Sequence, residues 1–600
     1  MTEKTINSLL ETEKVLWKLD DLYTSCNDPA LERDMEACRT LADGITKYQD
    51  RVYTLSARQC RSLVEQLEGL DTLLSRLATF AFLAFTTNTA DVEASALLQK
   101  IEELSAELGS KTIFFRLEWN ELADDQAQTL LADPEMAHYR HYLQAMRRFA
   151  PYQLSRPEEQ LLQEMSPAGR SAWNLLFEKV MGQMRFGDKG RTEEEVLTDL
   201  YAAKRDVRRS AADEMTTGLR EQLHVLTHVF NTLAAEKMII DRLRGYESWL
   251  APMNLENEIA ETTVATLISA VTERYPVVHR YYALKRELLE VDELFDYDRY
   301  APIPGQDETR IPWSRCKRIV LDSFAAFSPK MAEIAGMFFE KSWIHAPIVK
   351  NKRGGAFAHP CVPEVHPYVM VNYTGNLRDV STVAHELGHG VHQYLAAGQG
   401  FYNSDTPLVL AETASVFAEL LVFKAQVQLL DDPAARRAFI CGKLESIFAT
   451  VFRQVAMNRF EDAMHRARRN QGELSSDQLS EFWLATQKPM FGDSVTLRPD
   501  YGIWWSYIPH FLGTPGYVYS YAFGELLVLA LYSRYQQEGE AFVDNYLALL
   551  AAGGSKSPRE LLAPFDITLD DPAFWHGGLD IIEQMLGQVE EVAEVEKGQG

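Results

Sequence analysis

Cysteine and long apolar runs are both scarce in this chain, and their scarcity excludes two classes of protein. The six cysteines are scattered, without a C-x-x-C pair, which indicates reduced, unpaired thiols rather than a disulfide framework. The longest apolar run, Leu526 to Tyr532, is far too short to span a bilayer. The first residues, Met-Thr-Glu-Lys-Thr-Ile-Asn, lack the basic and apolar regions of a secretory signal. We therefore expect a cytoplasmic protein that has no membrane partner.

The sequence also lacks an excess of basic residues. Its 60 Lys and Arg stand against 86 Asp and Glu, for a formal net charge of −26. Proteins that bind nucleic acids or anionic membranes present basic surfaces, so we expect neither partner. The chain is rich instead in apolar residues, 46% of the total, which is enough for a large core. Because 600 residues exceed what one compact core normally holds, two or more lobes are expected.

Most of the chain has the periodicity of packed helices. Two apolar stripes recur at steps of three and four: Leu63, Leu67, Leu70, Leu74 and Leu77, then Leu97, Ile101, Leu104 and Leu108. A turn over 187–190 is followed by a capping box over 192–195 that opens a new helix. We place a boundary here, with an N-terminal helical lobe over 1–190 and a second domain over 191–600. The tail from about residue 590 is expected to be disordered.

Histidine is rare too, yet two of the 14 lie four residues apart in the segment Asp379 to His392. Apolar residues in this segment recur at helical spacing, so His385 and His389 project from one side of a helix. Two imidazoles in this arrangement can bind one metal ion, and Glu386 can reach a water beside the metal without being a ligand. This H-E-x-x-H motif is typical of zinc hydrolases. An accidental polar helix face is the alternative.

A catalytic zinc site needs a third protein ligand, and the candidates are His392, Glu412, Glu419 or a distant histidine. Three histidines on one straight helix would spread over about 10 Å, too far for one ion, so His392 is better explained as a supporting residue. Glu412 lies in a segment so apolar that its carboxylate should be buried and in need of a partner. A divalent metal would be such a partner, and a Lys or Arg is the alternative. Glu419, two turns further along the same side, is placed to support a ligand histidine.

Two stretches before the histidine motif are predicted to be strands, residues 353–358 and 367–373. An edge strand beside a metal can pair with the backbone of any peptide, and Gly354 and Gly355 would let another backbone come close. We therefore take Gly354, Gly355 and Ala356 as candidate substrate-binding residues. An ordinary small sheet with a glycine bend is the alternative.

Together these motifs resemble the oligoendopeptidase F and thimet oligopeptidase group of zinc metallopeptidases. His385-Glu-Leu-Gly-His389, a further histidine at 392, and Ala411-Glu-Thr-Ala-Ser415 after a gap of 22 residues (412 − 389 − 1) follow the pattern of that group. Further matches to the oligoendopeptidase F branch run through most of the chain: Trp17 to Tyr23, Arg244 to Ser248, His366 to Asn372, Ile508 to His510 and Tyr517 to Ala522.

The resemblance implies a mainly α-helical fold with two lobes around a deep central channel. A small β-sheet lies beside the zinc helix in the catalytic domain, here residues 191–600. One Zn²⁺ per chain is bound by His385, His389 and Glu412, and Glu386 is the general base. The substrates are short peptides.

The resemblance also implies a histidine and tyrosines that stabilise the oxyanion of the reaction. They correspond to His510, Tyr517 and Tyr521, and Tyr519 is a further candidate for substrate contact. The mammalian-type enzymes of the group carry one more tyrosine, where this chain has Gly524. Which of the three tyrosines touches substrate is therefore left open.

We predict a zinc-dependent oligoendopeptidase that hydrolyses internal bonds of short, unstructured peptides. A zinc carboxypeptidase or dipeptidyl carboxypeptidase would use the same metal chemistry but bind the C-terminal carboxylate of the peptide. A peptide-binding scaffold with a structural zinc is a third possibility, which an open coordination position and the presence of Glu386 disfavour. The oligomeric state stays open between monomer and homodimer.

Overall fold

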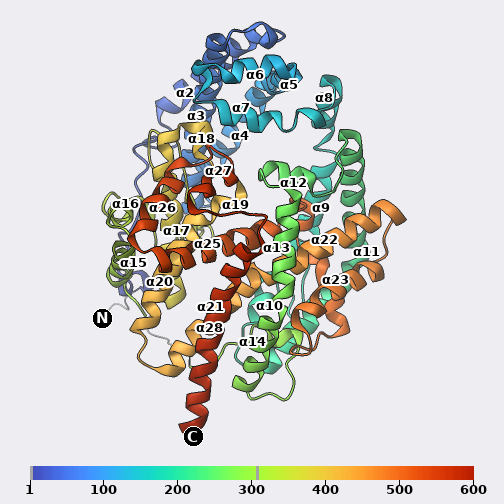
Figure 1. Cartoon of the computed structure of the whole chain (residues 1–600), viewed down its shortest axis with the longest axis vertical. Helices are drawn as coiled ribbons and strands as arrows, with labels where there is room; N and C mark the ends of the chain where they lie inside the picture. Colours follow the sequence, from blue (N-terminus) through green and yellow to red (C-terminus); the bar gives the residue numbers. More distant parts are fainter. Residues whose placement is uncertain (1–4, 306–309, 600) are drawn as a thin grey trace. The chain divides into compact units, whose positions relative to one another are not determined.

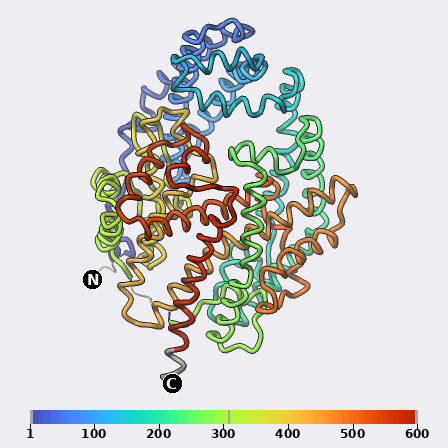
Figure 2. The backbone as a smooth tube through the Cα atoms, viewed as in Figure 1, coloured from blue at the N-terminus to red at the C-terminus, as the bar shows by residue number. Residues whose placement is uncertain are grey.

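Helices dominate the protein, which confirms the predicted fold class (Figure 1). The computed structural model describes residues 5–305 and 310–599, with side chains up to residue 594. The chain divides into two compact units, each made of three separate segments. Figure 2 traces the segments of unit 1 in blue to cyan, yellow-green to gold, and red. Unit 1 is Met1–Gln153, Glu308–Leu429 and Arg534–Ile567, and unit 2 is Leu154–Asp307, Leu430–Ser533 and Thr568–Gly600.

Unit 1 holds the first helices of the chain and a later group around the histidine motif. Its α-helices are α1 (Ile6–Leu9), α2 (Pro29–Ile45), α3 (Ala57–Thr87), α4 (Val92–Thr112), α5 (Phe114–Glu121), α6 (Asp124–Ala132), α7 (Arg140–Arg147), α15 (Trp313–Phe327), α16 (Pro329–Glu340), α17 (Leu377–Ala396), α18 (Phe401–Ser404), α19 (Leu408–Ala411), α20 (Thr413–Leu429), α26 (Glu540–Ala552) and α27 (Pro558–Leu562). Its 3-10 helices are η1 (Thr46–Tyr48), η2 (Val52–Thr54), η3 (Pro134–Met136), η4 (Ala150–Tyr152), η6 (Ala397–Gln399) and η8 (Ala563–Phe565).

In the described part of unit 2, all the secondary-structure elements apart from isolated β-bridges are helices. Its α-helices are α8 (Arg156–Met165), α9 (Arg170–Gln183), α10 (Glu193–Asp199), α11 (Arg205–Arg244), α12 (Ala251–Glu256), α13 (Glu261–Glu273), α14 (Tyr275–Leu288), α21 (Pro433–Thr450), α22 (Phe452–Gln471), α23 (Ser476–Phe491), α24 (His510–Gly513) and α28 (Pro572–Gln599). Two 3-10 helices, η5 (Asp296–Asp298) and η7 (Pro499–Tyr507), join them. The helix α25 (Tyr519–Glu538) begins in unit 2 and ends in unit 1.

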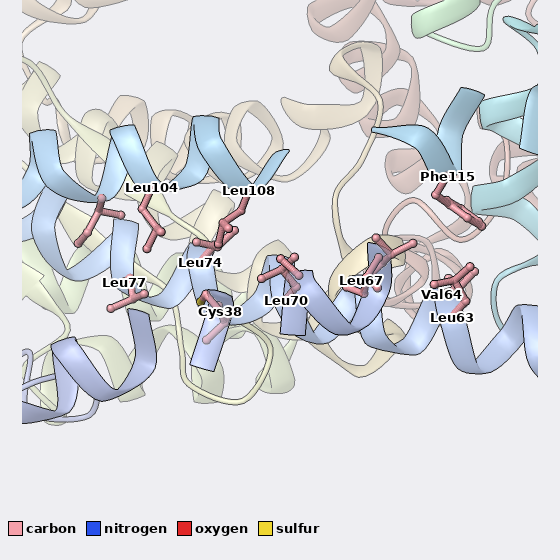
Figure 3. Packing of buried hydrophobic residues seen from close by; sticks show 14 of the residues in the cluster. Cys38, Leu63, Val64, Leu67, Leu70, Leu74, Leu77, Leu104, Leu108 and Phe115 are labelled. Carbon is pink, nitrogen blue, oxygen red and sulfur yellow. The ribbon is translucent and has the colours of Figure 1, made fainter. Parts of the chain in front are cut away.

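The leucine stripes of the N-terminal helices form a core, as predicted. The helix α3 begins with a capping box in which Ser56 and Gln59 bond each other's backbone N–H groups. Every leucine of both stripes is buried, and α4 packs along α3. Figure 3 shows Leu104 and Leu108 of α4 directed toward Leu74 and Leu77 of α3. These residues are therefore structural.

The predicted boundary near residue 190 lies inside unit 2. The local prediction is confirmed, because Gly187 and Gly190 have positive φ angles in a turn closed by a bridge from Phe186 to Arg191, and Thr192 starts α10 with a capping box. The residues before and after this turn share one core, however. Phe186 packs against Gly218 of α11 so closely that a Cβ there would lie 2.5 Å from the Phe186 ring. The turn over 187–190 therefore packs onto α11. The nearest division between the compact units lies between Gln153 and Leu154.

Three short strands form the sheet of unit 1. They are β1 (Ile344–His345), β2 (Phe357–His359) and β3 (Tyr368–Met370), in the order β1-β3-β2. The central strand β3 pairs in parallel with β1 and antiparallel with β2. Both predicted strands are present but shorter than expected, and β1 was not predicted because two residues carry no periodicity. The strand β2 is an edge strand, and α17 packs against both β2 and β3.

The helix α17 carries the histidine motif and is fixed at its start and along its length. Asn376 caps it, accepting from the backbone N–H of Asp379, whose carboxylate in turn binds Thr374. The helix packs along α20 and also against α26, from the last segment of unit 1. The hydroxyl of Tyr546 on α26 is fully buried and donates to the carbonyl of Thr413, 2.9 Å away. The last segment of unit 1 thus supports the start of α20.

Two further expectations concern the cysteines and the tail. All six thiols are unpaired, and five are buried. The helix α28 continues to Gln599, past the point where disorder was expected. There Val589 and Ala593 are buried and Glu590 pairs with Arg280, which explains why the helix extends so far. Among the described residues, every helix is too short or too polar to cross a bilayer.

Candidate metal centre

Two histidines from α17 and one glutamate from the next helix pair form a compact cluster in unit 1. The ring nitrogens of His385 and His389 and a carboxylate oxygen of Glu412 all lie within 4.8 Å of one another. Both Nε2 atoms lie 3.4 Å from the same oxygen, Glu412 Oε2. The sequence predicted these three residues as one set of ligands, and the fold brings them together.

Glu412 occupies the junction between α19 and α20, where the backbone leaves helical geometry. The hydroxyl of Ser415, one turn further on, donates to Glu412 Oε2 at 2.6 Å. Ser415 is fully buried, so it has no competing contact with bulk water. This hydroxyl orients the carboxylate toward the two imidazoles.

Gly388 sets the spacing between α17 and α20 at the level of the cluster. A Cβ at this position would lie 2.5 Å from the carbonyl oxygen of Ala414 and 2.7 Å from the Cα of Ser415. Only a glycine lets the two backbones come this close. The residue between the two histidines therefore brings the glutamate within reach of them.

The environment favours charge on the cluster in the absence of a metal. Glu419, as expected, contacts His385, with its Oε2 3.3 Å from Nδ1. Burial would lower the pKa of His385, but the bond to Glu419 and the charges of Glu412, Glu419 and Glu386 raise it to about 9. Burial would raise the pKa of Glu412, but the two histidines and Ser415 lower it to about 2.

The residues present fit a divalent metal such as zinc. Because Glu419 occupies Nδ1 of His385, its Nε2 is directed to the ion site, as is Nε2 of His389. Two imidazole nitrogens and one carboxylate oxygen are a donor set that catalytic zinc sites use, with a fourth position left for water. Such an ion would also neutralise the buried carboxylate of Glu412.

Glu386 lies next to the ligands without joining them. It is only 7% exposed, and burial raises its pKa even though both histidines oppose the shift. The backbone of Ala358, in the edge strand β2, also acts to lower this pKa. A carboxylate with a raised pKa is suited to accept and return a proton. The contact with β2 was not predicted, since spacing on a helix says nothing about a strand.

His392 does not contribute a ligand to the cluster. It is buried, and burial lowers its pKa to about 4. Its place beyond the His385–His389 pair agrees with the expectation that one straight helix cannot bring three histidines to one ion.

The predicted substrate-binding loop precedes the edge strand. Gly354 and Gly355 are exposed, and Gly355 has a φ of +78°. Neither glycine has an atom within 4 Å of its Cβ position, so another chain has room to approach. Asn372 donates to the carbonyls of Arg353 and Gly355, which ties the loop to the segment just after β3. Ala356 is half-buried and lies directly before β2.

The predicted oxyanion residues form a second group, in unit 2. Nε2 of His510 lies 3.3 Å from the hydroxyl of Tyr521, and the Tyr517 ring lies 4.8 Å from that of Tyr521. Tyr519 differs from the expectation. Its ring is completely buried and its hydroxyl accepts from Asn257 at 2.9 Å, because it sits on the core face of α25. Tyr519 therefore packs in the interior instead of contacting a peptide.

Comparison with known families and proteins shows what the whole chain is similar to. A family model described as Peptidase family M3 matches residues 199–581, and one described as Oligopeptidase F matches residues 118–186. Oligopeptidase PepF of Bacillus subtilis is 26% identical, over 98% of this chain and 89% of its own length. An oligoendopeptidase F homolog of Borreliella burgdorferi is 22% identical, over 98% of this chain and 99% of its own.

Solved structures share the fold. A putative peptidase from Chlamydophila abortus superposes with a TM-score of 0.86 at 23% identity, over 98% of this chain and 99% of its own. Oligoendopeptidase-F from Enterococcus faecium has a TM-score of 0.70 at 22% identity, over 94% of this chain and 98% of its own.

Proposed function

This chain belongs to peptidase family M3, and from this premise we propose that it is a zinc-dependent oligoendopeptidase that cleaves internal bonds of short peptides. The observation that carries the proposal is the cluster of His385, His389 and Glu412, with ligand atoms within 4.8 Å of one another and Glu386 beside it. When bound, zinc would supply a Lewis acid that acidifies water and polarises the scissile carbonyl.

The remaining chemistry falls to the chain's own residues. Glu386 takes the proton from the attacking water, which adds to the carbonyl carbon of the peptide bond. The same carboxyl group then returns the proton to the nitrogen of the leaving amine as the carbon–nitrogen bond breaks. Its burial suits both steps, since a raised pKa brings acid and base forms closer in energy.

His510 with Tyr517 or Tyr521 is proposed to donate hydrogen bonds to the oxyanion. The family resemblance supports this role, as does the contact between His510 and Tyr521. Loss of one such donor should lower turnover by about 10²- to 10³-fold. The metal cluster belongs to unit 1 and this group to unit 2, so their joint action, like the deep channel, stays a prediction.

The edge strand β2 supports a proposal for substrate binding. Its pairing with β3 uses one edge and leaves the other beside Glu386, where Gly354, Gly355 and Ala356 would guide a peptide backbone toward the metal. Main-chain pairing of this kind accepts many sequences, as expected for an enzyme that degrades peptides.

The decisive experiment replaces Glu386 by Gln. The variant should bind zinc with one ion per chain, measured by elemental analysis, while cleavage of a mixed library of short peptides disappears. Glu364→Gln, an exposed glutamate in the same unit, is the matched control and should keep full activity. If Glu386→Gln cleaves peptides at the wild-type rate, Glu386 is not the base. If removal of zinc with a chelator leaves activity intact, the metal mechanism fails.

Product mapping separates the two peptidase classes. An endopeptidase should cut a C-terminally amidated peptide at internal bonds, whereas a carboxypeptidase or dipeptidyl carboxypeptidase should lose activity on it. Binding without any cleavage would support the scaffold. A cytoplasmic location and a monomeric or dimeric state remain predictions.

A further inference from the structure

Two arginines in unit 2 contact one tyrosine, and neither forms an ion pair with an acid in the described part of the chain. Among the described residues, neither Arg299 nor Arg453 has a carboxylate oxygen within 4.0 Å. The tyrosine is Tyr300, which follows η5, and Arg453 lies in the first turn of α22. Buried charges are costly unless they are paired, so this pair is unusual.

Arg299 is held by the fold. It is 4% exposed, its Nε donates to the carbonyl of Asp296 at 2.8 Å, and its guanidinium lies over the rings of Tyr300 and Tyr501 at 5.1 and 4.8 Å. The carboxylate of Asp296 is already bound by Arg498, at 2.8 and 3.0 Å. The nearby acid is therefore committed to another guanidinium.

Arg453 has far fewer contacts. One of its terminal nitrogens donates to the Tyr300 hydroxyl at 3.3 Å, and its Nε is buried without an acceptor. Both Arg453 and Tyr300 are partly exposed, unlike Arg299. Burial would raise the pKa of Tyr300, but the two guanidinium groups lower it. The charge of Asp296 opposes this shift only in part, so the two guanidinium groups dominate the electrostatic field at Tyr300.

The charge of Arg453 also acts on a residue proposed for catalysis. Burial lowers the pKa of His510, and the charge of Arg453 lowers it further. A carboxylate bound at Arg453 would therefore reduce the positive potential at the His510 ring. The exposed ring of Tyr201, 5.0 Å from that of Tyr300, adds an apolar surface next to the charge.

We propose that Arg453 and Tyr300 form a subsite for a carboxylate of the peptide substrate, with Arg299 reinforcing the positive charge from the core. The carboxylate is either the free C-terminus or an acidic side chain, since both present the same planar pair of oxygens to a guanidinium. The inference rests on the proposed function, because it needs a peptide as ligand. It would make the enzyme select peptides by charge as well as by size.

The test compares peptides that differ in a single group. One pair has the same sequence with a C-terminal acid or amide, and a second pair, both amidated, has Glu or Gln at one position. The wild-type enzyme should show a KM lower by about 10- to 100-fold for the carboxylate member of one pair. The pair that shows the preference identifies the source of the carboxylate.

Three variants assign the preference to the subsite. Arg453→Gln should abolish it, and Arg453→Lys should retain part of it. Tyr300→Phe removes only a hydroxyl, and should weaken the preference without disturbing the fold. Arg466→Gln, at an exposed position of the same helix, is the control and should keep the wild-type ratio. If Arg453→Gln keeps that ratio, or if the wild type shows no preference in either pair, the proposal is overturned.

A binding measurement separates this inference from the proposed function. Equilibrium affinities for the same peptides, measured by calorimetry in the Glu386→Gln background, do not depend on turnover. A preference for carboxylates that Arg453→Gln removes would support the subsite even if no peptide were cleaved. Cleavage without such a preference would retain the peptidase and refute the subsite.

Discussion

Substitution of Gly388 by Ala is the sharpest test of how the metal centre is assembled. A Cβ would lie 2.5 Å from the carbonyl oxygen of Ala414, whereas ordinary contacts begin at 3.4 Å, so α17 and α20 must separate by about 0.9 Å. Overpacking of this kind costs about 1–3 kcal/mol, against a gain of about 1 kcal/mol in helix propensity. We expect a net destabilisation of at most about 2 kcal/mol.

The effect on the metal should be larger than the effect on the fold. Glu412 lies directly before α20 and would move with it, so the shift would carry its carboxylate away from His385 and His389. Metal affinity should therefore fall at least about tenfold. Urea unfolding of the metal-free protein measures the loss of stability, and competition with a chelator measures the loss of metal affinity. Gly336→Ala is the matched control, since no atom lies within 4 Å of its Cβ position on α16, and it should stabilise slightly. If a folded Gly388→Ala protein binds zinc with wild-type affinity, close approach of α17 and α20 at Gly388 is not needed to assemble the metal centre.

Two further predictions concern single buried side chains. Ser415→Ala removes the hydrogen bond to Glu412 and should lower zinc affinity by about tenfold. The melting temperature of the metal-free protein should change little. If the chelator concentration that removes half of the zinc is unchanged, the hydroxyl does not orient the ligand. Burial raises the pKa of Glu461 to about 8, although Gly516 donates to it. Its neutral form stabilises the fold below pH 4.5, and this contribution is lost as the pH rises toward 8. Glu461→Gln should therefore be more stable than wild type by about 4 kcal/mol at pH 7.5, but by only about 1 kcal/mol at pH 5. If the urea unfolding curves of the two proteins coincide at both pH values, burial of the Glu461 carboxylate does not affect stability in this way.

The three residues of the candidate metal centre could be predicted because each depends on local sequence. His385 and His389 share a helix face by spacing alone, and Glu412 stands out as an acid in an apolar segment. The family resemblance added His510 and the three tyrosines. The structure distinguishes Tyr519, which is buried, from the other two tyrosines, which lie near His510. Tyr519 belongs to the same motif as Tyr521 but faces the core, because residues two apart on a helix project to nearly opposite sides.

What could not be predicted depends on contacts between distant segments. The influence of Ala358 on Glu386 acts between a strand and a helix, and the hydroxyl of Ser415 reaches Glu412 only once α20 has folded. The boundary near residue 190 was placed on a real turn, but turn chemistry does not reveal whether the two sides share a core. The pairing of Phe186 with Gly218, which ties α9 and α10 to α11, is visible only in three dimensions.

The buried tyrosine of α26 has a consequence for biosynthesis. Tyr546 supports the carbonyl of Thr413, the residue directly after a proposed ligand, yet it is translated more than a hundred residues later. A nascent chain on the ribosome would therefore emerge with both imidazoles and the carboxylate long before their brace exists. Zinc uptake should wait until translation is almost complete, which would keep an unfinished protease from acting on its own unfolded chain.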